Sequence, residues 1–122
     1  MAKGKELGEF SLKTITITAS PGPGGSTMLQ GNFEGTGTGV GTVILTATFV
    51  GRKSGTFSTT GVALADNGET VSTTGSGEFD SVGINRWRTV GALQRSDGQT
   101  RVVEGEIDLA SRSWKGKYFE KV

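Results

Sequence analysis

Seven clusters of turn-forming residues, spaced about 15 residues apart, constrain most strongly what this chain can fold into. They are 21-PGPGG-25, 37-GTGVG-41, 51-GRKSG-55, 66-DNGE-69, 81-SVGI-84, 96-SDGQ-99 and 109-LASR-112. Each interval leaves room for a strand of roughly ten residues and a short turn. The Asn-Gly pair at 67–68 and the Asp-Gly pair at 97–98 are strong hairpin signals, because these residue types tolerate positive φ. The spacing therefore predicts eight sequential antiparallel strands.

Residue usage also favours strands over helices. Glycine accounts for 21 of the 122 residues, Thr and Ser are abundant, and no segment shows a helical period of apolar residues. Sequential antiparallel strands of this length close most easily into an up-and-down barrel, because closure removes the exposed sheet edges. We therefore expect residues 1–122 to form one all-β domain, an eight-stranded antiparallel meander barrel. An open sandwich is the alternative.

The composition excludes several classes of chemistry. With 13 basic and 12 acidic residues the net charge is +1, so bulk charge predicts no nucleic-acid partner. The chain has no Cys and no His, and its carboxylates lack metal-ligand spacing. We therefore expect no metal, no cofactor and no serine-hydrolase triad. Neither a signal-peptide pattern nor a membrane-length apolar run is present, so we expect a cytoplasmic protein without a membrane partner.

The last predicted hairpin separates an inner face from an outer one. If Ala110 and Ser111 form its loop, Ile107 lies opposite Trp114 and Val103 lies opposite Tyr118. The other face of the same hairpin then pairs two glutamates with two lysines, as a solvated face should. The apolar face, with Trp114 and Tyr118, is therefore expected to point inward.

The same face assignment can be extended from the last hairpin to the preceding strand, which contains Arg86 and Arg88. Treating 97–98 as a two-residue loop places Arg86 and Arg88 on the inner face and Trp87 outside. A slip of one residue would exchange these faces and send Trp87 inside. The remaining residues predicted to point inward are Phe79, Val71, Leu64, Val62, Phe49, Ala47, Leu45 and Val43. The registers of the first two strands stay open, because Phe10 and Leu12 compete there with Ile15 and Ile17, and Phe33 competes with Asn32 and Glu34.

Small residues on the predicted inner wall leave two interpretations open. Glycines at 75, 77, 105 and 116 project no side chain inward. They either leave a cavity for one small ligand or relieve strain where the sheet coils.

A buried guanidinium needs a partner, because an unpaired buried charge is costly. Arg88 therefore meets a ligand anion, an internal carboxylate such as Glu34 or Glu120, or water at the rim. Arg86 lies close enough to a turn to reach out of the barrel. The candidate ligand-binding residues are Arg86, Arg88, Trp114, Phe79, Phe49, Leu45 and Val103. If the protein is an enzyme, the candidate catalytic residues are Tyr118, Arg88 and Glu34.

Gly-x-Phe units recur along the chain, at 8-GEF-10, 31-GNF-33, 55-GTF-57 and 77-GEF-79. Together with 104-EGEIDLASRSWKGKYFE-120, they make the chain resemble small bacterial barrels of the calycin and allene-oxide-cyclase-like type. The resemblance implies a barrel that binds small hydrophobic molecules, in some cases as a cofactor-free cyclase or isomerase, and that oligomerises through its outer wall. No catalytic motif of such a family is present, so no catalytic residue is carried over.

These observations predict a barrel that holds a small, mostly apolar molecule with an anionic or carbonyl group. Any chemistry would be a cyclisation, isomerisation or elimination without a cofactor. The alternative is a non-catalytic structural or assembly barrel that acts through Trp87 and Phe119 on its outer wall. Trp87 and Phe119 are also the residues through which we expect a homo-oligomer to form.

Overall fold

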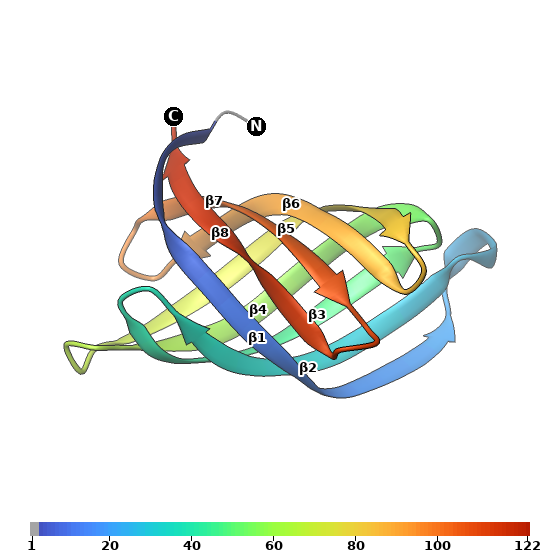
Figure 1. Cartoon of the computed structure of the whole chain (residues 1–122), viewed down its shortest axis with the longest axis horizontal. Coiled ribbons are helices and arrows are strands. Elements are labelled where there is room, and N and C mark those ends of the chain that lie inside the picture. Colours follow the sequence, from blue (N-terminus) through green and yellow to red (C-terminus); the bar gives the residue numbers. More distant parts are fainter. Residues whose placement is uncertain (1–2) are drawn as a thin grey trace.

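The computed structural model describes residues 3–122, and its eight strands form one closed antiparallel barrel (Figure 1). The strands are β1 (Lys3–Pro21), β2 (Thr27–Gly37), β3 (Val40–Gly51), β4 (Ser54–Ala65), β5 (Thr70–Gly83), β6 (Arg86–Arg95), β7 (Thr100–Asp108) and β8 (Ser113–Lys121). Each strand pairs with the next, and β8 pairs back onto β1. The predicted all-β meander barrel is confirmed, and it is consistent with a calycin-like architecture. Among residues 3–122 the structure contains no apolar helix of membrane-spanning length.

The turns alternate between the two ends of the barrel (Figure 1). The β2–β3, β4–β5 and β6–β7 turns lie at one end. The other end carries the β3–β4, β5–β6 and β7–β8 turns and the β1–β2 connection, which includes a short 3-10 turn, η1 (Pro23–Gly25). This alternation decides which inward side chains meet at each end of the barrel.

The β4–β5 and β6–β7 hairpins turn through three residues rather than two. In the β6–β7 turn, the Gly98 amide donates to the Arg95 carbonyl at 3.0 Å and Gly98 has a φ of 88°. The β4–β5 turn repeats this geometry at Gly68, where φ is 89°. This is a type I turn followed by a left-handed glycine, and it moves the register by one residue relative to a two-residue loop. Such a move exchanges the two faces of a strand.

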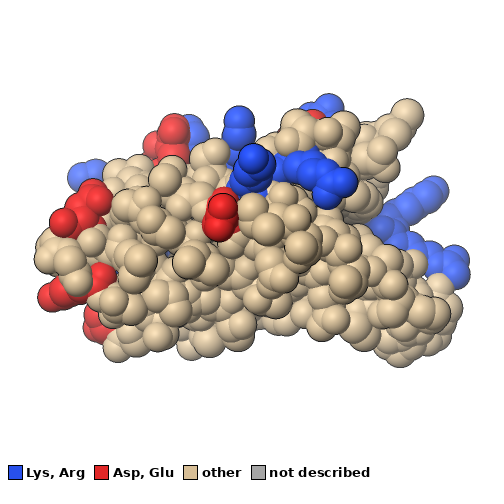
Figure 2. Space-filling model, turned by 90° about the horizontal axis from the view of Figure 1, so that it is seen from below, with Lys and Arg blue, Asp and Glu red and all other residues tan. Residues whose placement is uncertain are grey.

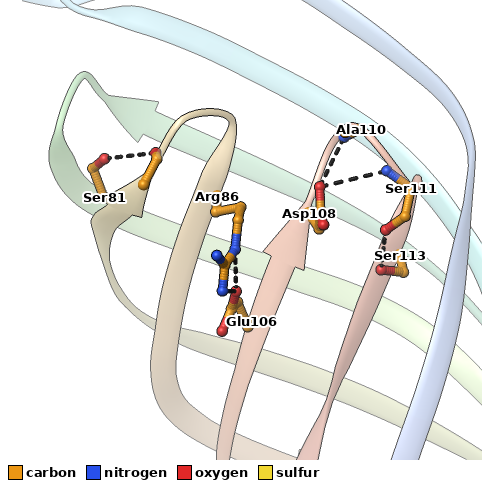
Figure 3. Close-up of polar contacts among 8 residues, drawn as sticks. Ser81, Arg86, Glu106, Asp108, Ala110, Ser111 and Ser113 are labelled. Carbon is orange, nitrogen blue, oxygen red and sulfur yellow. Dashed lines mark hydrogen bonds and ion pairs between the residues drawn. The ribbon is translucent and has the colours of Figure 1, made fainter.

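The predicted faces of β6 are therefore wrong. Trp87 pairs with Ile107 on the inner face, which sends Arg86 and Arg88 outward, where both are exposed. Figure 3 shows Arg86 on β6 reaching Glu106 on β7, with Nε donating to the carboxylate at 2.6 Å. The three-residue loop at 96–98 is the physical reason for the error.

The predicted face of β4 is wrong for the same reason. Leu64 pairs with Thr70 rather than Val71, so Val62 and Leu64 lie outside, 36% and 43% exposed. Phe57 points inward in their place and is buried.

The other predicted inner faces are confirmed. In the last hairpin, residues 109–112 form a four-residue loop, which keeps the parity of the predicted two-residue loop. Ile107 accordingly pairs with Trp114, and Val103 pairs with Tyr118. The other residues correctly placed inside are Val43, Leu45, Ala47, Phe49, Val71 and Phe79.

A bulge resolves the ambiguity in β1. The β1–β2 register shifts between Thr14 and Thr16, and Ile15 at the bulge is 46% exposed. Leu12 before the bulge and Ile17 after it can therefore both face the interior.

Phe33 occupies the inner face of β2 and is 2% exposed. Its neighbour Glu34 consequently points outward and is exposed. The prediction that Glu34 lies inside the barrel, as an internal carboxylate or catalytic residue there, is therefore wrong.

The Gly-x-Phe units have a packing role in the barrel. Phe57 lies opposite Gly77, and Phe79 lies opposite Gly55, in adjacent strands. A Cβ added at Gly77 would lie 2.8 Å from the Phe57 ring, and one added at Gly55 would lie 2.9 Å from the Phe79 ring. These inward glycines therefore make room for aromatic rings from the neighbouring strand, as aromatic side chains do when they cover glycine in sheets.

Aromatic rings close the middle of the barrel. The Trp114 ring is buried, and its centroid lies 5.2 Å from that of Phe33, 5.6 Å from Phe49 and 5.9 Å from Phe57. The indole Nε1 donates to the Thr89 hydroxyl at 3.1 Å, which satisfies a polar group at the centre of the core. We call these four aromatic residues and Thr89 the waist.

Charge is unevenly distributed over the outer wall. Strands β3 and β4 contain no charged residue, whereas the outer faces of β6, β7 and β8 carry arginine, glutamate and lysine. Figure 2 shows charged side chains gathered along one side and at the ends of the view, with a broad uncharged area between them. The exposed apolar residues of the uncharged wall are Ile44, Val62 and Leu64.

Phe119 points outward, as predicted for the outer wall. Lys3 Nζ lies 4.5 Å from its ring centroid, and Val102 opposite it is only 1% exposed. Trp87, its predicted partner in an outer interface, lies inside, so the predicted Trp87–Phe119 surface does not exist. Oligomerisation through another part of the wall stays a prediction.

Candidate functional site

The waist divides the barrel interior into two cavities at opposite ends. The first, of about 120 Å³, lies at the end with the β6–β7 turn and is lined by Arg95, Arg101 and Tyr118. The second, of about 470 Å³, lies at the end with the β3–β4 turn and is lined by Phe79 and Trp87 among others. We call them the arginine cavity and the aromatic cavity.

Apolar side chains form most of the arginine cavity. Its walls include Leu12, Val43, Leu45, Phe57, Val103 and Trp114. The two charged side chains, Arg95 and Arg101, lie beside the β6–β7 turn. A ligand in this cavity would therefore meet an apolar floor and a cationic rim, an arrangement common in small-molecule sites.

Arg95 and Arg101 lie on the inner faces of adjacent strands. Leu93 pairs with Arg101 across β6 and β7, so Arg95 is the diagonal neighbour of Arg101 on the same face. Both side chains therefore reach the same end of the cavity, although they come from opposite sides of the turn.

The guanidinium of Arg95 has a protein partner for only some of its hydrogen-bond donors. Its Nη2 lies 2.9 Å from the Asp97 carboxylate, and its side chain is 27% exposed. Its Nε is buried and has no hydrogen-bond partner. One N–H group of Arg95 is therefore buried without an acceptor.

Arg101 has neutral partners near the turn. Its Nη1 donates to the Thr100 carbonyl at 3.4 Å, and its Nη2 donates to the Gln99 side-chain oxygen. Among residues 3–122 it forms no ion pair. Its charge is therefore not balanced by a direct carboxylate contact.

The carboxylate of Asp97 at this rim has a lowered pKa. The Gln99 amide donates to its carboxylate at 3.1 Å and lowers the pKa of Asp97 below 3.8. Partial desolvation acts in the opposite direction, and the nearby charges of Arg95 and Arg101 lower the pKa further. Asp97 therefore stays ionised at neutral pH and balances one of the two arginines.

Tyr118 forms part of the wall beside the arginines. Its hydroxyl donates to the Thr38 carbonyl at 2.5 Å, which ties β8 to the β2–β3 turn. This proton already has a backbone acceptor, so the observed role of Tyr118 is to position the cavity wall. A catalytic role for Tyr118 stays a prediction.

The predicted site residues do not form one site. Trp114, Tyr118, Leu45 and Val103 line the arginine cavity, whereas Phe49 and Phe79 line the aromatic cavity. The remaining predicted residues, Arg86, Arg88 and Glu34, lie on the outer wall.

The sequence reasoning missed Arg95 and Arg101. Arg101 shares the predicted inner face of Val103 and Ile107, although it is not among the candidate residues. Reading Ser96-Asp97-Gly98 as a three-residue loop, which typically has Gly at its third position, places Arg95 inside as well. Among residues 3–122, no group of three or more acidic side chains is arranged to hold a metal ion. The arginine pair is thus the main charged feature of the interior.

No family model, no curated protein and no solved structure matches this chain. The fold and the two cavities therefore carry the functional argument by themselves. Of these, the arginine cavity combines a mostly apolar lining with two cationic side chains.

Proposed function

We propose that this barrel binds a small, mostly apolar carboxylate in the arginine cavity, with Arg95 and Arg101 holding the anion. The observation that carries the proposal is the convergence of two inward arginines on an apolar cavity, one of them with a buried, unpartnered Nε.

The energetics of the guanidinium groups support an anionic ligand. A buried donor without a partner costs about 1–3 kcal/mol. A carboxylate oxygen would satisfy the Arg95 Nε and balance the charge of Arg101. Arginine suits this task, since its planar donors match the two oxygens of a carboxylate.

The cavity volume limits the size of the ligand. A dry protein cavity of about 150 Å³ holds one benzene ring. The arginine cavity, at about 120 Å³, is slightly smaller, so it limits the apolar part of the ligand to at most one small ring or a chain of roughly six carbons.

A binding role is favoured over catalysis. The resemblance to allene-oxide-cyclase-like barrels is the argument for a cyclase or isomerase. The lining of the arginine cavity, however, contains no carboxylate and no histidine that would act as a general base. We therefore propose a carrier or sensor of a small carboxylate rather than an enzyme.

Calorimetric titration with a matched ligand pair tests this proposal. Hexanoate should bind at pH 7, and hexan-1-ol should bind at least tenfold more weakly, because it lacks the charge. Arg101→Met should weaken hexanoate binding by about 10- to 100-fold, as expected for a charge-assisted hydrogen bond.

Arg88→Met is the matched control, because Arg88 belongs to the same hairpin but lies exposed on the outer wall. It should leave hexanoate binding unchanged. Equal affinities for hexanoate and hexan-1-ol, or a loss of binding in Arg88→Met alone, would contradict the proposal.

A further inference from the structure

We infer that the aromatic cavity is a second, separate binding site, and that it takes an uncharged aromatic molecule of about two fused rings. Its volume of about 470 Å³ lies within the range of ordinary small-molecule sites, about 300–1,000 Å³. It is the larger of the two interior cavities, and the proposed carboxylate site does not use it.

Four aromatic side chains from different strands surround this cavity. They are Phe33 on β2, Phe49 on β3, Phe79 on β5 and Trp87 on β6. The Phe49 and Phe79 rings already pack edge to face, with centroids 5.7 Å apart. A further ring entering between these walls would find the edge and face contacts that aromatic groups prefer.

The one charged side chain of the described lining lies exposed to solvent. Arg52 is the only charged side chain among the described lining residues. Its Nε donates to the Gly25 carbonyl at 2.8 Å, and its Nη2 donates to the same oxygen. The guanidinium links the β3–β4 turn to the β1–β2 connection, and because it is exposed, water and salt screen its charge. It therefore offers a buried anion less compensation than the half-buried Arg95 and Arg101 do.

The lining of the aromatic cavity has few polar side chains. Apart from Arg52 and the Trp87 indole, Thr27 is the only polar side chain on the described lining. A neutral ring system with one hydroxyl matches this lining, because its rings are buried and its hydroxyl has a partner near the mouth. A cation would lose hydration without a carboxylate on the described lining, and an anion would lose hydration with only the solvent-screened Arg52 to compensate it.

The waist keeps the two sites apart. Phe33 and Phe49 line the aromatic cavity, and Phe57 lines the arginine cavity. All three pack against the Trp114 ring. Both cavities can therefore be occupied at once, by ligands of different chemistry.

Each cavity has its own tryptophan, which makes the inference testable. Trp87 lines the aromatic cavity and Trp114 lines the arginine cavity, and they are the only tryptophans of the chain. In the Trp114→Phe variant, 2-naphthol should change Trp87 emission saturably, and 2-naphthoate should do so at least tenfold more weakly. Calorimetry with the unaltered protein gives the same comparison if Trp114→Phe does not fold.

Two cavity-filling variants show in which cavity each ligand binds. Leu29→Phe narrows the aromatic cavity and should weaken 2-naphthol binding at least tenfold, with hexanoate binding unchanged. Leu45→Phe narrows the arginine cavity and should have the opposite effect. Circular dichroism confirms that each variant is folded before it is titrated.

Three results would overturn the inference. They are the absence of saturable 2-naphthol binding to the folded protein, its loss in Leu45→Phe but not in Leu29→Phe, and equal affinity for 2-naphthoate. Failure of hexanoate to bind would refute the proposed carboxylate site alone, because the 2-naphthol titrations do not depend on it.

Discussion

At the residue scale, the hydrogen bond between Trp114 and Thr89 determines how the barrel is filled. Both side chains are buried, at 4% and 2% exposure, so water cannot replace this hydrogen bond. The bond fixes the indole in the plane where four phenylalanine rings, including Phe10, pack around it. One polar contact thereby orients the largest side chain of the waist.

We predict that Thr89→Val destabilises the protein by about 1–3 kcal/mol, because the buried indole N–H loses its acceptor while the side-chain volume is kept. Urea unfolding followed by circular dichroism measures this change. Thr89→Ser keeps the hydroxyl and should retain more of the stability. If Thr89→Val unfolds at the same urea concentration as the unaltered protein, the bond contributes nothing to stability.

At the element scale, loop length decides which face of a strand is inside. With Arg101 inward on β7, the β6–β7 loop of three residues turns Arg95 inward beside it and turns Arg86 and Arg88 outward. The left-handed conformation of Gly98 makes this loop possible.

We predict that Gly98→Ala costs about 1–2 kcal/mol, the penalty of a Cβ in the left-handed region. A Cβ at Gly98 would meet no atom within 4 Å, so backbone strain is the whole effect. Gly83→Ala is the control, because Gly83 has no positive φ and its nearest contact would be an ordinary 3.9 Å from Arg86. Thermal unfolding should separate the two variants, and equal midpoints would contradict this account of the loop.

The sequence predicts strand number and order well, because turn residues are strong local signals. It also predicts the inner faces of β3, β5, β7 and β8. The predicted faces of β4 and β6 are inverted, because Asn-Gly and Asp-Gly occur in both two-residue and three-residue loops. The faces of β3 and β5 are still correct, because the β3–β4 and β5–β6 registers also differ by an odd number of residues from two-residue loops at 52–53 and 82–83. The bulge at Ile15 has no such local signal, because no turn residue marks the register shift between Thr14 and Thr16.

At the scale of the whole molecule, the barrel is neither filled nor hollow. The inward glycines leave space that neighbouring aromatic rings occupy, so the middle is packed and the two ends stay open. The sequence could not reveal this division, because it depends on rings from several strands meeting at Trp114. The division produces one cationic and one aromatic cavity within a single small barrel.

The central claim is that a carboxylate reaches the buried side of Arg95. The most direct measurement follows the side-chain Nε–H signals of the arginines by NMR during a hexanoate titration. The Arg95 and Arg101 signals should shift saturably, with Arg95 moving downfield as its unpartnered Nε–H gains an acceptor, while the Arg88 signal stays in place. Saturable shifts at Arg88, or none at Arg95 and Arg101, would contradict the claim.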